Sequence, residues 1–129
     1  MILSEVIACD NIDECGVLLQ MSVGNMKGYV TQIERDTRKN ADFRRVLYTG
    51  KHSQLVLMNL EPGEEIGEET HEDRDQFFRF EGGEGSVFID GVEHRVKDGN
   101  GVNVPAGAKH NVVNTSNSKE QPTEEQAET

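Results

Sequence analysis

The sequence contains no tryptophan and only 5% aromatic residues, so its core must be largely aliphatic. No apolar run approaches ~20 residues, which excludes a transmembrane helix at the level of sequence. Basic residues are also few, because 13 Lys and Arg stand against 24 Asp and Glu, a formal net charge of −11. Nucleic acids and anionic membranes both require a basic surface, so we expect neither as a partner. A small or cationic ligand, or a metal ion, suits this charge better.

Cysteine is scarce as well, with only Cys9 and Cys15. One pair does not make a secreted disulfide scaffold, and no CxxC motif occurs. This usage predicts two reduced thiols in a cytoplasmic protein. The N-terminus shows no basic segment followed by a long apolar stretch, so we expect no signal peptide and a cytoplasmic location.

The 129 residues correspond to one domain and divide into three zones. Residues 1–25 are mixed in pattern and predict an N-terminal extension or a lead-in strand. Residues 26–114 are dense in strand and turn signals and predict the folded barrel domain. Residues 115–129 carry four Glu and no apolar residue larger than Ala. This segment cannot offset its ordering entropy by burial, so we expect a disordered acidic tail.

The central zone reads as β structure. Residues 54–60 form a short apolar run that a Pro-Gly pair closes, and residues 76–81 alternate between two faces. Asp90-Gly91 is a type I′ hairpin signal between two further strands. Residues 29–38 predict either a strand or a short helix. Short strands with Gly-rich turns every 8–12 residues predict an all-β fold, a sandwich or an antiparallel β-barrel.

Two stretches concentrate the residues that can do chemistry. The first runs from Gly63 to Gly83 and contains Glu69-Thr70-His71 and Gln76. The second runs from Gly99 to Asn114 and contains Pro105-Ala106-Gly107 and His110. Residues two apart on a strand face the same way, so Glu69 and His71 could share an interior with His110 and form a metal site. Spacing alone leaves the ordinary alternative open, in which these histidines are surface or core residues.

These two stretches resemble the two signature motifs of the cupin superfamily, which are small β-barrel proteins. The second matches the superfamily pattern at Gly99, Pro105, Gly107, His110 and Asn114. The first matches in its spacings and in Gly63, His71 and Gly83, but Glu69 stands where His is common and Gln76 where Glu is common. The resemblance is strong over residues 54–114 and is closest to small single-domain bacterial cupins of unassigned function, a mannose-6-phosphate isomerase-like subgroup.

The resemblance implies an antiparallel β-barrel or jelly roll over residues 26–114. Similar proteins continue after Asn114 with another apolar strand, whereas here the polar tail follows. The barrel therefore either lacks a C-terminal strand and has an open edge, or it receives a replacement. The replacement could come from residues 1–8 or from a partner subunit.

By the same resemblance, the metal ligands are expected at Glu69, His71, Gln76 and His110. Two imidazoles and one carboxylate suit non-haem Fe(II), and Mn²⁺, Ni²⁺ or Zn²⁺ are compatible with the same donors. The Gln76 carbonyl is a neutral and weaker ligand than a carboxylate. A degenerate barrel that binds an organic ligand without metal is the alternative. No catalytic residue and no organic cofactor site is indicated.

The expected function is metal-dependent chemistry on a small molecule, either Fe(II) dioxygenase-like or sugar or keto-acid isomerase-like. A non-catalytic small-ligand-binding or sensor protein is the alternative. Phe78 and Phe80 share the parity of Gln76 and are expected to line the substrate pocket, and Tyr48 to close its mouth. Phe77 and Arg79 face outward, where they are expected to serve a contact between two subunits of a homodimer, which the resemblance implies.

Overall fold

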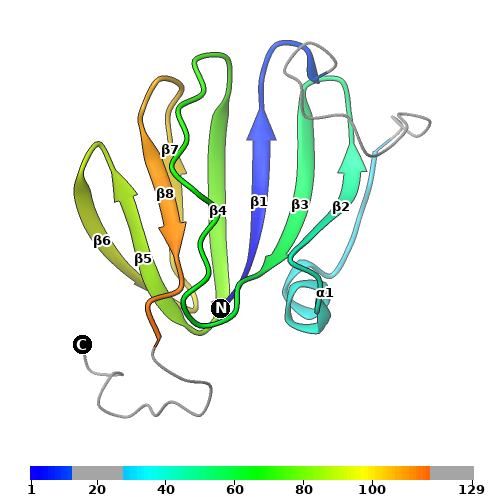
Figure 1. Cartoon of the computed structure of the whole chain (residues 1–129). Helices are drawn as coiled ribbons and strands as arrows, with labels where there is room; N and C mark the ends of the chain where they lie inside the picture. The colour runs from blue at the N-terminus through cyan, green and yellow to red at the C-terminus, as the bar shows by residue number, and fades with distance from the viewer. Residues whose placement is uncertain (13–27, 117–129) are drawn as a thin grey trace.

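Eight strands and one short helix form the described part of the chain, residues 1–12 and 28–116, in the computed structural model (Figure 1). Part of the predicted N-terminal extension (13–25) and most of the predicted tail (117–129) lie outside these residues. The elements are β1 (Ile2–Ala8), α1 (Ile33–Lys39), β2 (Arg44–Thr49), β3 (Ser53–Asn59), β4 (Asp75–Gly82), β5 (Glu84–Ile89), β6 (Val92–Lys97), β7 (Gly101–Val104) and β8 (His110–Val113).

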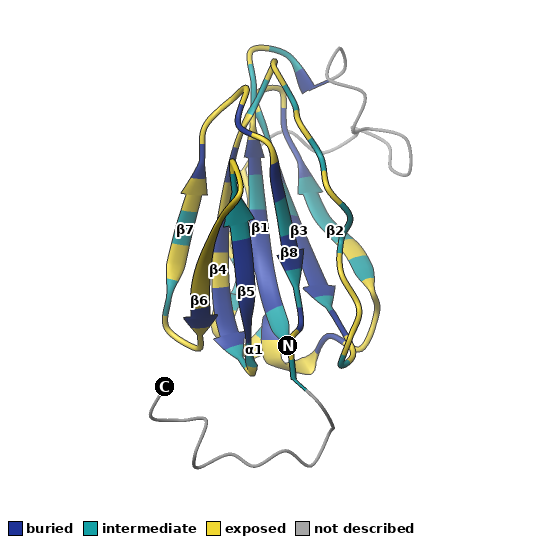
Figure 2. Ribbon diagram, turned by 60° about the vertical axis from the view of Figure 1, so that its left-hand side comes forward, coloured by how far each residue is buried: buried dark blue, intermediate teal, exposed yellow. Residues whose placement is uncertain are grey.

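The strands build two antiparallel sheets that enclose one core. One sheet has the order β2-β3-β1-β4-β7 and the other the order β6-β5-β8. The all-β class with an antiparallel barrel or jelly roll is thereby confirmed. Figure 2 shows many buried residues on β1 and β3 and mostly exposed residues on β6. The fully buried side chains include Leu3, Val56, Leu60, Phe78, Phe80, Val87 and Val112.

Strand β1 lies inside the larger sheet and not at its edge. It pairs along its whole length with β3 on one side and with β4 on the other. The alternation of its sequence puts Leu3, Glu5 and Ile7 on the inner face, and all three are buried. The amine of Met1 donates a hydrogen bond of 2.9 Å to the Leu60 carbonyl and fixes the start of the strand. Residues 1–8 therefore form part of the barrel wall.

The strand β8 has two neighbours: β5 on one side and the acidic segment 63–70 on the other. Single bridges join Glu65 to Val113 and Glu69 to His110. Further backbone hydrogen bonds connect Ile66 N to Val112 O (3.0 Å) and Gly63 N to Asn114 O (2.9 Å). An edge strand with unpaired backbone groups is a template for aggregation, and this segment covers that edge.

Local signals placed several elements correctly. Asp90 and Gly91 both have positive φ, 50° and 84°, as a type I′ hairpin requires between β5 and β6. In β4, Gln76, Phe78 and Phe80 are buried while Phe77 and Arg79 are exposed, as the alternation predicts. In the region 29–38, predicted as a strand or a short helix, residues 33–38 belong to the helix α1, which contacts β1 and β4, and residues 29–32 have no regular structure.

The cysteine prediction needs a correction. Cys9 is disulfide-bonded, so the expectation of a reduced thiol at this position is wrong. Local composition does not show which cysteines the fold brings within bonding distance, and one cysteine pair gave no disulfide pattern. In the part of the chain that the structure describes, no helix is long and apolar enough to cross a membrane.

Candidate functional site

The two motif stretches meet at one end of the barrel. Glu69 lies in the extended segment before β4, and His110 is the first residue of β8. Their backbones exchange two hydrogen bonds, Glu69 N to His110 O and His110 N to Glu69 O, both 2.8 Å long. A third bond of 2.8 Å runs from Gly107 N to the His71 carbonyl. The two stretches are thus connected through their backbones.

The imidazole of His110 is buried and presents an unused nitrogen to the interior. The residue is 2% exposed, and its Nδ1 lies 3.2 Å from the Ala108 carbonyl oxygen. A carbonyl only accepts, so the ring donates from Nδ1 and carries its lone pair on Nε2. Nε2 itself has no hydrogen-bond partner among the described residues. This is the arrangement in which a metal-ligating histidine is usually held, with its other nitrogen hydrogen-bonded to the protein.

The carboxylate of Glu69 lies between the two histidines. Its Oε1 is 2.9 Å from His71 Nε2 and 3.8 Å from His110 Nε2. The two rings are tilted to each other with centroids 6.1 Å apart. The side chains of Glu69 and His71 are 37% and 25% exposed, so they have room to turn, whereas His110 is fixed. The structure therefore brings three of the four predicted ligands together.

Gln76, the fourth predicted ligand, faces the interior from β4 and is 3% exposed. Its Nε2 donates a hydrogen bond of 2.5 Å to Oε2 of Glu5, which lies on β1. Burial raises the pKa of the Glu5 carboxyl, while the Gln76 hydrogen bond and the Arg44 charge act in the opposite direction. Sequence analysis missed Glu5. The available signal was an acid at the inward position between Leu3 and Ile7.

The predicted pocket residues occupy two different places. Phe78 and Phe80 are completely buried in the core, and the Phe78 ring centroid lies 6.2 Å from that of His110. Phe78 thus forms an apolar wall beside the candidate site. Tyr48 lies on β2, the strand at the far edge of the same sheet. Its ring stacks on the ring of Tyr29, with the two centroids 5.5 Å apart.

The side chains of Glu69, His71 and His110 are of the chemical types that bind a metal ion, but their atoms are not spaced for coordination. Among residues 1–12 and 28–116, no three His, Cys, Asp or Glu side chains are spaced to hold an ion as they stand. The bond between Glu69 and His71 uses donor atoms that an ion would need. The unpartnered Nε2 of His110 and the adjacent carboxylate nevertheless match the requirements of a first-row cation.

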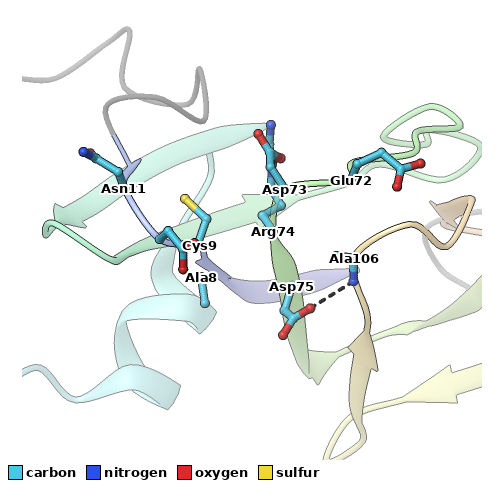
Figure 3. Close-up of a pocket in the computed structure, with 9 residues that line it drawn as sticks. Ala8, Cys9, Asn11, Glu72, Asp73, Arg74, Asp75 and Ala106 are labelled. Atoms are coloured by element: carbon cyan, nitrogen blue, oxygen red, sulfur yellow. Dashed lines mark hydrogen bonds and ion pairs between the residues drawn. The ribbon is translucent and has the colours of Figure 1, made fainter.

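A pocket of about 470 Å³ opens beside this end of the barrel. Figure 3 shows its lining, which comes from the end of β1 and from the loops before β4 and after β7. The Ala106 N–H donates to Asp75 Oδ1 at 2.9 Å and ties two of these segments together. The charged residues of the lining are Asp10, Glu72, Asp73, Arg74 and Asp75. Four carboxylates against one guanidinium make this pocket negative.

Two facing antiparallel sheets with polar groups converging from two loops define a small β-barrel protein with a candidate interior site. The sequence pattern of the Cupin_2 family, described as "Cupin domain", matches residues 56–120, which is 65 of 129 residues. The chain belongs to this family.

Two proteins of related sequence and one solved structure are similar to this chain. The chain is 44% identical over 97 residues to the uncharacterized protein YrkC of Bacillus subtilis, covering 70% of this chain and 52% of that protein. It is 40% identical over 93 residues to an uncharacterized protein of Acanthamoeba polyphaga mimivirus, covering 69% of this chain and 58% of the relative. The crystal structure of BH2720 from Bacillus halodurans matches with a TM-score of 0.70 and 38% identity, covering 76% of this chain and 79% of the other. The chain thus spans just over half the length of the two uncharacterized relatives.

Proposed function

We propose that this cupin binds one divalent transition metal ion at Glu69, His71 and His110, with Gln76 as the fourth member of the site. The observation that carries the proposal is His110 Nε2, a buried lone pair without a partner, 3.8 Å from a carboxylate oxygen. Burying a polar atom without a partner is costly, so such an atom calls for a ligand. Two imidazoles and a carboxylate suit Fe²⁺ foremost, and Mn²⁺, Ni²⁺ or Zn²⁺ as well.

Two kinds of chemistry are consistent with such a site. A bound cation would supply Lewis acidity or a binding place for O₂, as in isomerase-like or dioxygenase-like reactions on a small molecule. The protein's own part is to hold the donors, exclude water with the Phe78 wall and admit the substrate. The resemblance to the mannose-6-phosphate isomerase-like subgroup makes sugar isomerisation one form of this proposal, with an unphosphorylated sugar in place of the phosphate ester.

The charge of the neighbouring pocket bears on the substrate class if a substrate enters through it. Among the described residues that line this pocket, four are carboxylates and one, Arg74, is a base. A phosphate ester entering there would meet repulsion. The basic residues Arg44 and Arg45 lie on β2, which is separated from β4 by β3 and β1. We therefore propose a neutral or cationic small molecule, such as an unphosphorylated sugar, as the substrate or ligand.

The alternative is a binding or sensor protein that works without metal. It is favoured by the hydrogen bond of 2.9 Å between His71 and Glu69, which satisfies both side chains without an ion. In that case the interior donors would bind the hydroxyl or amino groups of an organic ligand.

Elemental analysis tests the proposal. The full chain is expressed without an affinity tag, purified without chelator, and compared with His71→Ala and with His94→Ala, an exposed histidine on β6. We expect near-stoichiometric Fe, Mn, Ni or Zn in the wild type and in His94→Ala, and loss in His71→Ala. A wild type that is empty and takes up no added metal would contradict metal binding and favour the alternative.

A further inference from the structure

Glu5 is an acid in a row of core residues. It shares the inner face of β1 with Leu3 and Ile7, which are 0% and 3% exposed, and it is itself only 5% exposed. A carboxylate at such a position is costly unless an opposite charge or several donors accompany it. An apolar residue would fill the same place at no such cost, so the buried carboxylate calls for a partner.

The side-chain hydrogen bond recorded for Glu5 comes from Gln76 Nε2, at 2.5 Å. An amide donor orients a carboxylate but brings no positive charge, and Arg44, whose charge acts on Glu5, forms no ion pair with it among the described residues. Gln76 also stands at the position where the first cupin motif usually has Glu. The motif position on β4 therefore carries an amide, Gln76, and the carboxylate beside it comes from Glu5 on β1.

Glu5 belongs to the same interior as the candidate ligands. Its carboxylate accepts the hydrogen bond of Gln76, which is one of the four candidate ligands. Gln76 and Glu5 lie on neighbouring strands, in register Ile7 to Gln76 and Glu5 to Phe78, and the Phe78 ring borders the His110 ring. A cation bound at this place would offset the cost of burying the Glu5 carboxylate.

We propose that Glu5 supplies the carboxylate ligand that the first motif lacks at the position of Gln76, and that Gln76 positions the Glu5 carboxylate. This inference rests on the proposed metal site and changes its composition: two histidines and two carboxylates would bind the ion, from β1, the segment before β4, and β8. Two carboxylates and two imidazoles favour Mn²⁺ or Fe²⁺ over soft ions such as Cu(I). Gln76 would act through the hydrogen bond seen in the structure, as a positioning residue.

Calorimetric titration of the metal-free full chain with Mn²⁺ tests the assignment. Four proteins are compared: wild type, Glu5→Gln, the swap Glu5→Gln/Gln76→Glu, and Glu68→Gln. Glu68 is an exposed acid in the same acidic segment, so its variant removes one charge from the surroundings without touching the interior. Circular dichroism shows that each variant is folded. Loss of supporting groups around a metal site costs about 10–100-fold in affinity, so loss of a direct ligand should cost at least as much.

We expect Glu5→Gln to weaken Mn²⁺ binding by about 100-fold or more, Glu68→Gln by less than about threefold, and the swap to regain most of the loss. If Glu5→Gln binds as tightly as the wild type while His110→Ala loses binding, Glu5 is not a ligand and the proposed metal site stands without it. If the wild type takes up neither Mn²⁺ nor Fe²⁺, Ni²⁺ or Zn²⁺, both proposals fail. If Glu5→Gln does not fold, the swap decides, because a folded swap without Mn²⁺ binding would contradict the assignment.

Discussion

Glu69 and His110 are bonded backbone to backbone in both directions, with two hydrogen bonds of 2.8 Å. The acid of the first motif and the histidine of the second are therefore neighbours irrespective of what their side chains do. A side-chain substitution at either position leaves these two bonds intact. Effects on ligand binding can thus be separated from effects on folding.

Glu69→Gln is the first prediction. We expect metal affinity to fall at least about tenfold, because the amide has no charge to offer the ion. The melting temperature in chelator should stay within about 2 °C of the wild type, because the backbone bridge and the exposed half of the side chain remain. Titration calorimetry and thermal unfolding measure the two quantities. A large loss of stability in chelator would mean that the Glu69 carboxylate has a structural role.

Gln76→Glu should tighten metal binding and destabilise the metal-free protein. The new carboxylate would face Glu5 in a buried place, which we expect to cost about 2 kcal/mol in free energy of unfolding without metal. A cation would relieve this repulsion, so added metal should raise the melting temperature more than in the wild type. Gln32→Glu, which adds a charge at an exposed position, is the control. Weaker metal binding in Gln76→Glu would show that residue 76 does not face the ion.

The stability of the metal-free protein should depend on pH because of Glu5. Burial raises its pKa above the ordinary 4.5, so the folded state holds this proton more tightly than the unfolded chain. The favourable contribution of Glu5 to the free energy of unfolding is complete below about pH 4.5. It is lost as the pH rises through the pKa of Glu5 in the folded state. Glu5→Gln does not titrate, so in chelator the variant should gain stability relative to the wild type as the pH rises above about 4.5. Chemical denaturation across this range measures the difference, and a constant difference would contradict a raised pKa.

Gly85→Ala should destabilise the barrel. A Cβ at Gly85 would lie 2.4 Å from the Val113 carbonyl oxygen and 2.6 Å from the Met1 sulfur, so β5, β8 or Met1 would have to shift. We expect a loss of about 1–3 kcal/mol, as for overpacking in a core. Gly101→Ala is the matched control, because its Cβ would crowd the Phe77 ring, 3.1 Å away and able to turn, and would lie at an ordinary contact distance of 3.9 Å from the Phe78 carbonyl oxygen. Equal losses in both variants would show that the close approach at Gly85 is not the cause.

Phe77 offers a test of the expected homodimer. It is 40% exposed on the outer face of β4, next to Arg79 on the same face. If two copies pair through this face, Phe77→Ser should shift the protein from dimer to monomer in light scattering at micromolar concentration. Val92→Ser, which removes an exposed apolar residue from the hairpin of the other sheet, should leave the mass unchanged. A wild type that is monomeric at every concentration would contradict the dimer.

The sequence predicted best what depends on local order. The type I′ turn at Asp90-Gly91 and the alternation in β4 follow from the φ requirements and the period of two along a few residues. The resemblance to the two cupin motifs, and not the spacing alone, led us to expect Glu69, His71 and His110 in one region. The position of these side chains follows from the resemblance and needed no long-range reasoning.

The interaction of Glu5 with Gln76 could not be predicted from local sequence patterns. The pattern Leu3-Glu5-Ile7 shows that an acid points inward, but not what it meets there. Its contact with Gln76 spans 71 residues and depends on β1 entering the sheet between β3 and β4. Pairing over such a distance leaves no periodic signal in the sequence. The disulfide state of Cys9 was missed for a different reason, because a single pair of cysteines does not by itself show whether its thiols are oxidised.

The place of β1 also has a consequence for synthesis. The strand leaves the ribosome before both of its neighbours, and its pairing with β4 needs residues as far along the chain as Gly82. Until then Ile2, Leu3, Val6 and Ile7 form a nascent apolar segment that can pair with β3 but lacks its second sheet partner. We therefore expect nascent-chain proteolysis to show full protection of β1 only at lengths beyond β4.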